Sequence, residues 1–156
     1  MGMTFRKAER ADIPALALTD IPPLARIRAA EWGSEEYWIN RITGYLDGTH
    51  NPQKALEPRV IFVALEDSVP IGFIAGHLTT RFGCDAELEW INIVAERRGS
   101  EAAYELFRLL KDWFVEKNAL RVCVNCDKEN KRAYDFYTRQ GARPLNDHWL
   151  VWDHIL

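Results

Sequence analysis

The segment from Arg97 to Ala103 brings together two arginines, a glycine and a serine just before an apolar helical repeat. Apolar residues recur at helical spacing from this segment to Phe114. Backbone N–H groups and the positive end of a helix dipole favour a bound phosphate, and arginine side chains add charge. Glycine lets the backbone come close to a ligand. The pattern predicts an anion site, suited to a pyrophosphate, at this helix N-terminus.

Cys123 and Cys126 form a CxxC pair, a second pattern that could carry chemistry. A redox pair of this spacing normally opens a helix, whereas this one lies in or just after the apolar run VCVN, which reads as a strand. Strand parity would direct the two thiols to opposite faces. Cys84 and scattered histidines are the only further zinc ligands on offer. We therefore interpret the cysteines as buried apolar residues and expect no metal site, with a redox protein as a weaker alternative.

The composition restricts the class of protein that could carry an anion site. The chain has 156 residues, 47% of them hydrophobic and 28% charged, which predicts a single globular domain over residues 1–156. A net charge of −3 gives no global positive field to hold nucleic acid. The apolar runs are far shorter than the roughly 20 residues that cross a bilayer, and no secretory signal is recognisable. We expect a cytoplasmic protein with neither nucleic-acid nor membrane partners.

The predicted elements that position these residues alternate between strands and helices. Period-two patterns and turn signals predict strands at 4–8, 60–67, 71–80, 86–94, 120–125 and 148–155, with a loop at 48–58. Caps and helical spacing predict a helix from Asp12 interrupted by Pro22 and Pro23, a helix capped by Ser34, and helices at 99–117 and 130–140. This order predicts a mixed sheet covered by helices, and the unit at 86–126 should be a right-handed crossover between parallel strands.

Two separated motifs resemble the GNAT superfamily of N-acetyltransferases, and the element order matches that fold over essentially the whole chain. INIVAERRGSEAAYELFRLL is similar to the family's acetyl-CoA signature, V-x-P-x-x-R-G-x-G-x-G/A running into a helix. NKRAYDFYTRQGARP is similar to its N-x-x-A-x-x-F/L-Y-x-x-x-G-F motif. Two positions depart from the first signature: Glu101 replaces the middle glycine and Ala95 the proline. The resemblance implies an α/β (α+β) fold with a mostly antiparallel central sheet, one parallel β-α-β crossover and helices on both faces.

The resemblance also implies acetyl-CoA as cosubstrate, with no metal required, and it assigns the residues that bind it. They fall in a strand, the phosphate loop and the second motif: Ile91, Ile93, Val94, Arg97, Arg98, Gly99, Ser100, Glu101, Ala102, Ala103, Asn130, Ala133 and Tyr137. Exposed backbone groups between the strands at 86–94 and 120–126 would bind the pantetheine arm as a pseudo-strand. A carboxylate at position 101 would disfavour phosphate if it faced the ligand, so Glu101 should point away.

The catalytic residues expected from the resemblance are a tyrosine acid and a glutamate base. Tyr137 takes the place of the tyrosine that protonates the departing thiolate. An acceptor amine with a pKa near 10.4 is mostly protonated at neutral pH and needs a base. Glu87 and Glu89 are the candidates, and Glu87 leads because the segment AEL aligns best. In a regular strand these carboxylates and Ile91 share one face, although a bulge would break that parity.

The expected acceptor is the primary amine of a small molecule or of a peptide. The first 95 residues carry 9 basic and 13 acidic side chains, which suits a cationic amine, and the remainder carries 11 and 10. Aromatic candidates for its pocket are Trp32, Trp38, Tyr45 and Trp90. A catalytically silent module that binds acyl-CoA or another small molecule with the same fold is the alternative function. The composition is also compatible with a homodimer.

Overall fold

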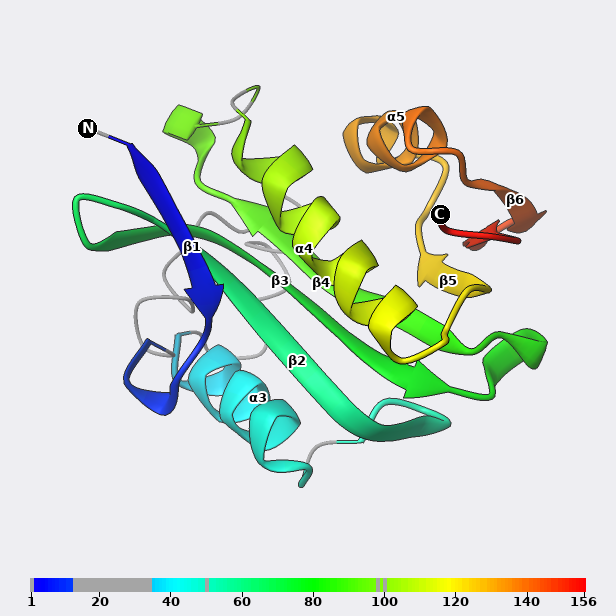
Figure 1. The fold of residues 1–156 in the computed structure, drawn as a ribbon, viewed down its shortest axis with the longest axis horizontal. Helices are drawn as coiled ribbons and strands as arrows, with labels where there is room; N and C mark the ends of the chain where they lie inside the picture. The colour runs from blue at the N-terminus through cyan, green and yellow to red at the C-terminus, as the bar shows by residue number, and fades with distance from the viewer. Residues whose placement is uncertain (1, 13–34, 50, 98, 100) are drawn as a thin grey trace.

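A computed structural model describes residues 2–12, 35–49, 51–97, 99 and 101–156 of the chain (Figure 1). The described strands form one sheet in the order β1-β2-β3-β4-β5-β7-β6. Their bounds are β1 (Met3–Lys7), β2 (Ala55–Glu66), β3 (Val69–Thr79), β4 (Ala86–Ile93), β5 (Val122–Asn125), β6 (Arg143–Asn146) and β7 (Trp149–Trp152). The α-helices are α3 (Glu35–Asp47), α4 (Ala102–Glu116) and α5 (Lys131–Arg139), and the 3-10 turns are η1 (Arg10–Asp12), η2 (Arg81–Gly83) and η3 (Ala95–Arg97).

The strand directions confirm the expected mixed sheet. β4 and β5 run parallel, and α4 connects them, whereas the other neighbouring strands are antiparallel. A parallel pair needs a crossover connection, and the amphipathic α4 fills that role. The helix predicted at 99–117 is therefore the crossover helix, although its first regular residue is Ala102.

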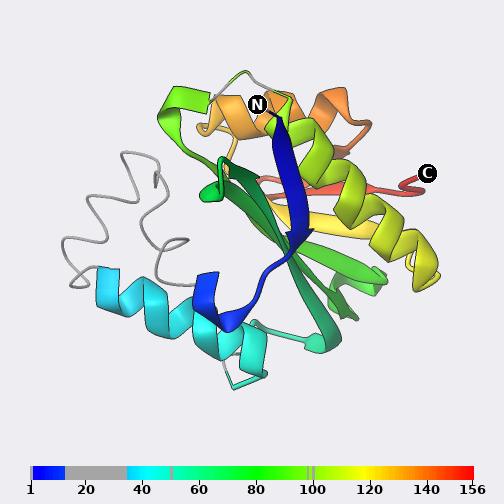
Figure 2. The ribbon, with the colours of Figure 1, turned by 60° about the vertical axis from the view of Figure 1, so that its left-hand side comes forward.

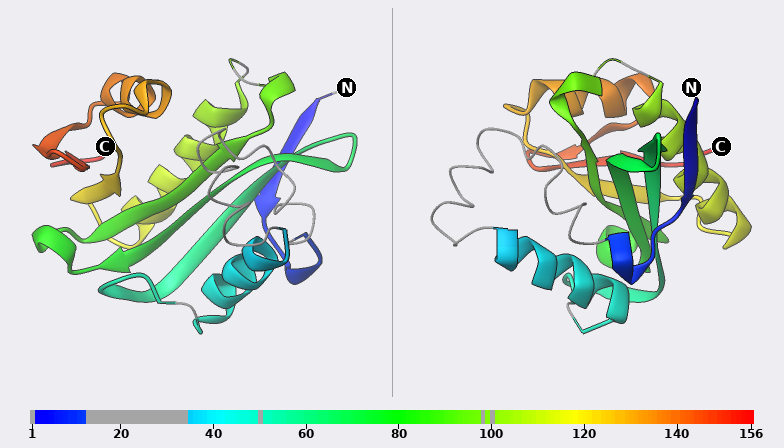
Figure 3. Two further views of the ribbon diagram at one scale, coloured as in Figure 1. Left: turned by 180° about the vertical axis from the view of Figure 1, so that it is seen from behind. Right: turned by 90° about the vertical axis from the view of Figure 1, so that its left-hand side faces the viewer.

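The sheet has an apolar core on each of its two faces. In β2, Val60, Phe62 and Ala64 belong to the core beneath α4 and α5. The alternate residues Ile61, Val63 and Leu65 belong to the core beneath α3. Figures 2 and 3 show α3 and α4 on opposite sides of the sheet. Each face is thus closed by helices, as the period-two pattern of a doubly covered strand requires.

The structure corrects two sequence predictions about strands. The expected loop at 48–58 ends early, because β2 begins at Ala55 and pairs there with Thr79, with a register shift between Leu56 and Arg59. The final strand is shorter than 148–155, and a strand that we did not predict, β6, pairs with it. Asp147 and His148, between Asn146 and its partner Trp149, form the turn of this hairpin.

The helix predicted to follow Asp12 lies outside the described residues, and Asp12 itself is the last residue of η1. The Asp12 side chain accepts hydrogen bonds from the Glu9 N–H and from the Arg6 side chain. Pro22, Pro23 and Ser34 lie outside the described residues. Within the described part of the chain, the helices are all too short or too polar for a membrane span.

Candidate active site

Strand β4 contains one residue more than the part of β3 that it pairs with. Leu88 pairs with Gly76. The neighbouring β3 residue, Ala75, pairs with Trp90, so the ladder passes over Glu89. An extra residue of this kind is a β-bulge, which bends the strand and increases its twist. Glu89 therefore occupies an irregular position at the middle of the sheet.

The bulge changes which side chains share a face of β4. Leu88 and Ile91 both contact the core beneath α4, although residues three apart in a regular strand would lie on opposite faces. Glu87 precedes the bulge and pairs with His77. The regular parity that would place Ile91 with the two carboxylates is therefore broken, whereas Glu87 and Glu89 remain neighbours.

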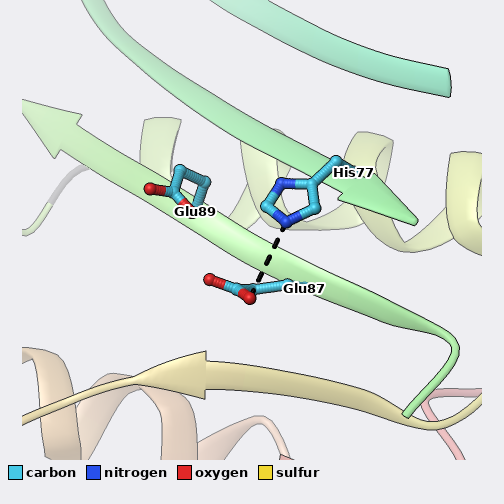
Figure 4. A group of neighbouring side chains, drawn as sticks. All are labelled: His77, Glu87 and Glu89. Carbon is cyan, nitrogen blue, oxygen red and sulfur yellow. Dashed lines mark ion pairs between the residues drawn. The ribbon is translucent and has the colours of Figure 1, made fainter. Parts of the chain in front are cut away.

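His77, Glu87 and Glu89 form one cluster (Figure 4). One nitrogen or oxygen atom from each of the three side chains lies within 4.8 Å of the other two. His77 is 0% exposed and Glu87 is 4% exposed. Arg81 on η2 donates a hydrogen bond from Nε to Glu87 Oε1 at 3.1 Å, which holds the inner carboxylate and supplies an opposite charge.

The environment of Glu89 raises the pKa of its carboxyl from 4.5 to about 8. Burial is the largest cause, and the negative charge and hydrogen bond of Glu87 act in the same direction. The positive charges of Arg41 and Arg81 partly oppose them. A carboxyl with this pKa accepts and releases a proton close to neutral pH, as a general base must. The same residue types also bind metal ions, but here two guanidinium groups already supply positive charge.

Strands β4 and β5 part after Leu88, between the two carboxylates. Their pairing covers Ala86, Glu87 and Leu88 on β4 and ends there. The Val94 N–H donates to the Ile71 carbonyl of β3 at 2.8 Å. Because hydrogen bonding alternates along an antiparallel ladder, the backbone groups at 91 and 93 are directed away from β3, toward the side where β5 has diverged.

This geometry separates two β4 residues, Ile91 and Ile93, from the following Val94, all three of which were expected to bind the coenzyme. Ile91 and Ile93 present their backbone N–H and C=O groups to the open edge. The Val94 N–H is already engaged by Ile71, so it is not a donor for a ligand in this arrangement. A ligand arm with amide groups could extend the sheet at 91 and 93 as an added strand.

The predicted phosphate loop lies between η3 and α4. The side chain of Arg97 is paired with Glu66 at the end of β2, with Nε to Oε1 at 2.9 Å. Gly99 has a φ of +80°, a left-handed conformation that glycine adopts without strain. Glu101 is exposed and precedes α4 without capping it through its side chain. The positive end of the α4 dipole lies at Ala102.

Two predicted loop residues, Arg98 and Ser100, lie outside the described residues. Ala103, which follows Ala102 in the first turn of α4, is half-buried.

Tyr137 lies on α5 and is buried against the core beneath α4. Its ring makes an edge contact with Trp152, the two centroids 5.8 Å apart. Burial raises the pKa of its phenol, and the neighbouring Cys126 adds to the effect. The phenol therefore keeps its proton at neutral pH, which an acid must do before it can donate.

Asn130 and Ala133 form the N-terminus of α5. The Asn130 side chain accepts a hydrogen bond from the Ala133 N–H at 3.4 Å, as an N-cap residue does. The helix ends before Gly141, whose φ is +101°, which agrees with the predicted C′ glycine. Asn130 and Gly141 therefore have structural roles at the two ends of α5. The coenzyme-binding roles of Asn130 and Ala133 stay predictions.

Two of the aromatic candidates for the acceptor pocket lie beside the carboxylates. The rings of Tyr45 and Trp90 are 5.0 Å apart, and the Tyr45 hydroxyl is 2.8 Å from Nδ1 of His77. Trp38 lies within α3, whereas Trp32 is outside the described residues. The side of the sheet that α3 covers thus combines aromatic rings with the cluster of two carboxylates.

The cysteines of the CxxC pair lie in separate apolar clusters. Cys123 packs with Cys84 and Val151, whereas Cys126 belongs to the core beneath α4. Burial raises the pKa of the Cys126 thiol to about 11 and also raises that of Cys123. Thiols with raised pKa values are poor nucleophiles, so the surroundings of this pair do not favour redox chemistry.

The sequence prediction missed three charged or polar neighbours of the carboxylates: His77, Arg81 and Arg41. His77 follows Phe73 and Ala75 at a spacing of two residues in the segment IGFIAGHLTT. Period-two spacing alone would therefore have placed it on the same face of β3 as these two residues. Its position opposite Glu87 depends on the strand register, which the sequence does not specify.

Comparison with known proteins places this chain in a family. The family described as "Acetyltransferase (GNAT) family" matches residues 24–142. The chain therefore belongs to the GNAT acetyltransferases, which confirms the resemblance of its two motifs. A search of curated proteins finds no significant match.

Solved structures with the same fold include two from archaea and one from a bacterium. PaiA N-acetyltransferase from Thermoplasma acidophilum, solved in complex with coenzyme A, is 15% identical with a TM-score of 0.71 and 99% of each chain covered. Ard1 from Thermoplasma volcanium is 16% identical, with a TM-score of 0.71 over 100% of this chain and 99% of the other. An acetyltransferase from Thermus thermophilus is 17% identical, with a TM-score of 0.67 and coverages of 97% and 96%. At these identities the likeness establishes the fold alone.

Proposed function

We propose that the protein transfers an acetyl group from acetyl-CoA to a primary amine by direct attack in a ternary complex. The observation that carries the proposal is the half-buried Glu89, which lies beside Glu87 where β4 parts from β5 and has a pKa of about 8. A base that ionises near neutral pH, placed beside an open strand edge, suits amine acylation. Residues 1–156 would form one acetyltransferase domain.

The fit of acetyl-CoA to this chain rests on backbone groups. The outward N–H and C=O groups at Ile91 and Ile93 would pair with the amides of the pantetheine arm. The left-handed Gly99 and the α4 dipole beyond it would receive the pyrophosphate. Glu101 is exposed, so its carboxylate can turn to solvent. The structure of PaiA with coenzyme A, a protein of the same fold, supports this choice of cosubstrate.

The chain's own groups would handle two protons. Acetyl-CoA, when bound, supplies an activated thioester. Glu89 would accept a proton from the acceptor ammonium, and Glu87 keeps it basic by its charge. A backbone N–H at the open edge of β4, with Ile91 the nearest outward residue, would donate to the thioester oxygen. Tyr137, a protonated phenol, would donate its proton to the departing sulfur.

We prefer Glu89 to Glu87 as the base, although the alignment of the segment AEL favoured Glu87. Glu87 is 4% exposed, and Arg81 already donates a hydrogen bond to its Oε1, so it is less accessible to an acceptor amine. Glu89 lies at the bulge and is less deeply buried. Its pKa of about 8 lets it take up and release a proton near neutral pH.

The acceptor would be the amine of a small molecule or a peptide. Two carboxylates attract an ammonium group, and the rings of Tyr45 and Trp90 provide aromatic surface beside them. A homodimer is a further prediction that awaits measurement of the molecular mass in solution.

Calorimetric titration with acetyl-CoA, followed by detection of free thiol with a panel of amines, tests the proposal. We expect saturable binding and amine-dependent release of coenzyme A. Failure to bind acetyl-CoA at millimolar concentration would refute the proposal. Binding without transfer to any amine would favour the catalytically silent module instead.

A further inference from the structure

A buried pair of polar side chains lies behind the carboxylates, on the side away from the open strand edge. Tyr45 of α3 and His77 of β3 are both 0% exposed. The Tyr45 hydroxyl and Nδ1 of His77 are 2.8 Å apart, which is a hydrogen bond. Two polar groups in an apolar core are costly unless they are paired, so this pair fixes the orientation of the imidazole ring.

The second ring nitrogen of His77 faces the inner carboxylate. Nε2 lies 3.7 Å from Glu87 Oε1, and Figure 4 shows the ring over that carboxylate. No described residue offers Nε2 a hydrogen bond of normal length. Such distances in an active site without substrate often shorten once the reactants are bound.

The hydrogen bond at Nδ1 determines which ring nitrogen carries the proton. Burial raises the pKa of the Tyr45 phenol, so its O–H remains a donor. A neutral imidazole has one donor and one acceptor nitrogen. If the phenol donates to Nδ1 of His77, the hydrogen lies on Nε2 and faces the negative oxygen of Glu87. The opposite tautomer would place a lone pair against that oxygen, which is repulsive.

Charged groups from several of the described elements act on this cluster or on Tyr45 beside it. Arg81 of η2 binds Glu87, and Arg41 of α3 acts on Glu89. Arg59 of β2 donates from Nη1 to the Tyr45 carbonyl at 3.0 Å, and its guanidinium lies 5.1 Å from the centre of the Tyr45 ring.

Two further titratable groups complete the surroundings. Glu57 of β2 adds negative charge near Tyr45. From β5, Cys123 pairs with Glu87, and burial raises the pKa of its thiol, so it is uncharged.

We propose that His77 is a positioning residue of the acetyl-transfer site: held by Tyr45, its Nε2–H faces Glu87 and stabilises the inner carboxylate as an anion. The outer carboxylate, Glu89, is then the one that exchanges the proton. Without the N–H, the state in which both carboxylates are ionised loses a favourable dipole, so the shared proton is held more tightly. This inference rests on the proposed function.

Nitrogen NMR of the whole protein tests the orientation of the ring without any assay of activity. The His77 ring signals are assigned by their loss in His77→Gln. At pH 7 we expect a hydrogen on Nε2 and a hydrogen-bonded acceptor at Nδ1. A bare Nε2 would overturn the proposal, even if the protein transfers acetyl groups. If no transfer is found with any amine, the proposed function fails while this measurement still decides the ring orientation.

The pH profile of kcat/KM tests the positioning role. Asn at position 77 places its amide near Nδ1 and removes the donor at Nε2, whereas Gln extends its amide toward Nε2. His77→Asn should move the acid limb of the kcat/KM profile to higher pH by about one unit. This shift lowers kcat/KM about tenfold at pH 7 and changes it little at pH 9.5. His77→Gln should restore most of the difference. His154→Asn, at an exposed position, is the matched control.

Equal acid limbs in the Asn and Gln variants would overturn the positioning role. If His77→Asn does not fold, Tyr45→Phe decides, because it keeps the ring and removes only the hydroxyl that fixes Nδ1. We expect Tyr45→Phe to raise the acid limb in the same direction by a smaller amount. An unmoved acid limb in that variant would refute the inference.

Discussion

The exchange of Glu89 for Gln and of Glu87 for Gln should have opposite consequences for the pH dependence of turnover. Glu89→Gln removes the proposed base, while its amide keeps nearly the same shape. Glu87→Gln removes the neighbouring charge and hydrogen bond that raise the pKa of Glu89. The first variant should lose the acid limb of kcat/KM, and the second should keep it at a lower pH.

The magnitudes follow from the pKa of about 8 at Glu89. In the wild type about one molecule in ten carries the ionised base at pH 7, so kcat/KM should rise about tenfold between pH 6 and pH 7 and level off above pH 8. Loss of a general base typically costs about 10²–10⁴-fold, so Glu89→Gln should lower kcat/KM by at least about 100-fold on the plateau. In Glu87→Gln the pKa of Glu89 should fall only part of the way toward its ordinary 4.5, because burial, the largest cause of the shift, remains, so the acid limb should move to lower pH without disappearing.

The assay is release of coenzyme A thiol from pH 5.5 to 9.5, with the best amine from the acceptor panel at low concentration. Acetyl-CoA affinity, measured by calorimetry, controls for damage to the coenzyme site, and Glu129→Gln controls for loss of a carboxylate at an exposed position. The assignment would be refuted if Glu87→Gln abolished turnover and Glu89→Gln only shifted the profile. Glu87 would then be the base, as the alignment suggested.

Thermal stability gives an independent check on the burial of Glu89. Because its folded pKa is raised, its contribution to stability is fully present below about pH 4.5 and is lost as the pH rises through about 8. The Tm of Glu89→Gln minus the Tm of the wild type should therefore increase as the pH rises from 5 to 9. A difference in Tm that does not change with pH would show that the carboxyl is not desolvated.

Two further substitutions test the acid and the phosphate loop. Tyr137→Phe should lower kcat by about 10²-fold or more with little change in acetyl-CoA affinity. Tyr134→Phe, on the same helix, is the control. Equal turnover of the two variants would remove Tyr137 from the mechanism. Glu66→Gln should free the Arg97 guanidinium for the pyrophosphate and tighten acetyl-CoA binding by up to about fivefold, the range of a surface ion pair. Calorimetry measures the affinity for acetyl-CoA. The control is Asp67→Asn, which removes one negative charge at the position next to Glu66. Equal tightening of acetyl-CoA binding by both variants would exclude a specific release of Arg97.

The elements around the coenzyme motifs were predictable because local signals define them. Apolar spacing located α4, and the expected and observed ends of this helix differ by at most three residues. Asn130 and Gly141 correctly marked the two ends of α5. Helix caps and helical periodicity depend on residues within one or two turns, so a single sequence contains the whole signal.

Features that depend on strand register were not predictable in the same way. The alternating segment AELEWINI is consistent with a regular strand, and nothing in it marks Glu89 as the bulge residue. His77 was missed for the same reason, because its proximity to Glu87 is a cross-strand contact. β6 was missed because its sequence, RPLN, has few residues that favour strands and is extended by pairing with β7.

The bulge and the glycine opposite it explain how the proposed base and the outward edge of β4 arise together. Gly76 pairs with Leu88 just before the bulge, and a Cβ there would lie 2.8 Å from atoms of both Leu110 and Phe114 on α4. A side chain at this position would have to displace the side chains of Leu110 and Phe114, so the glycine allows α4 to pack closely against the sheet beside the bulge. The extra residue, Glu89, then leaves the regular ladder as the strand bends, and the strand continues beyond it in a shifted register. One irregularity in β4 therefore accounts both for the carboxyl with a raised pKa and for the outward backbone groups that follow it, which is why the two features lie side by side.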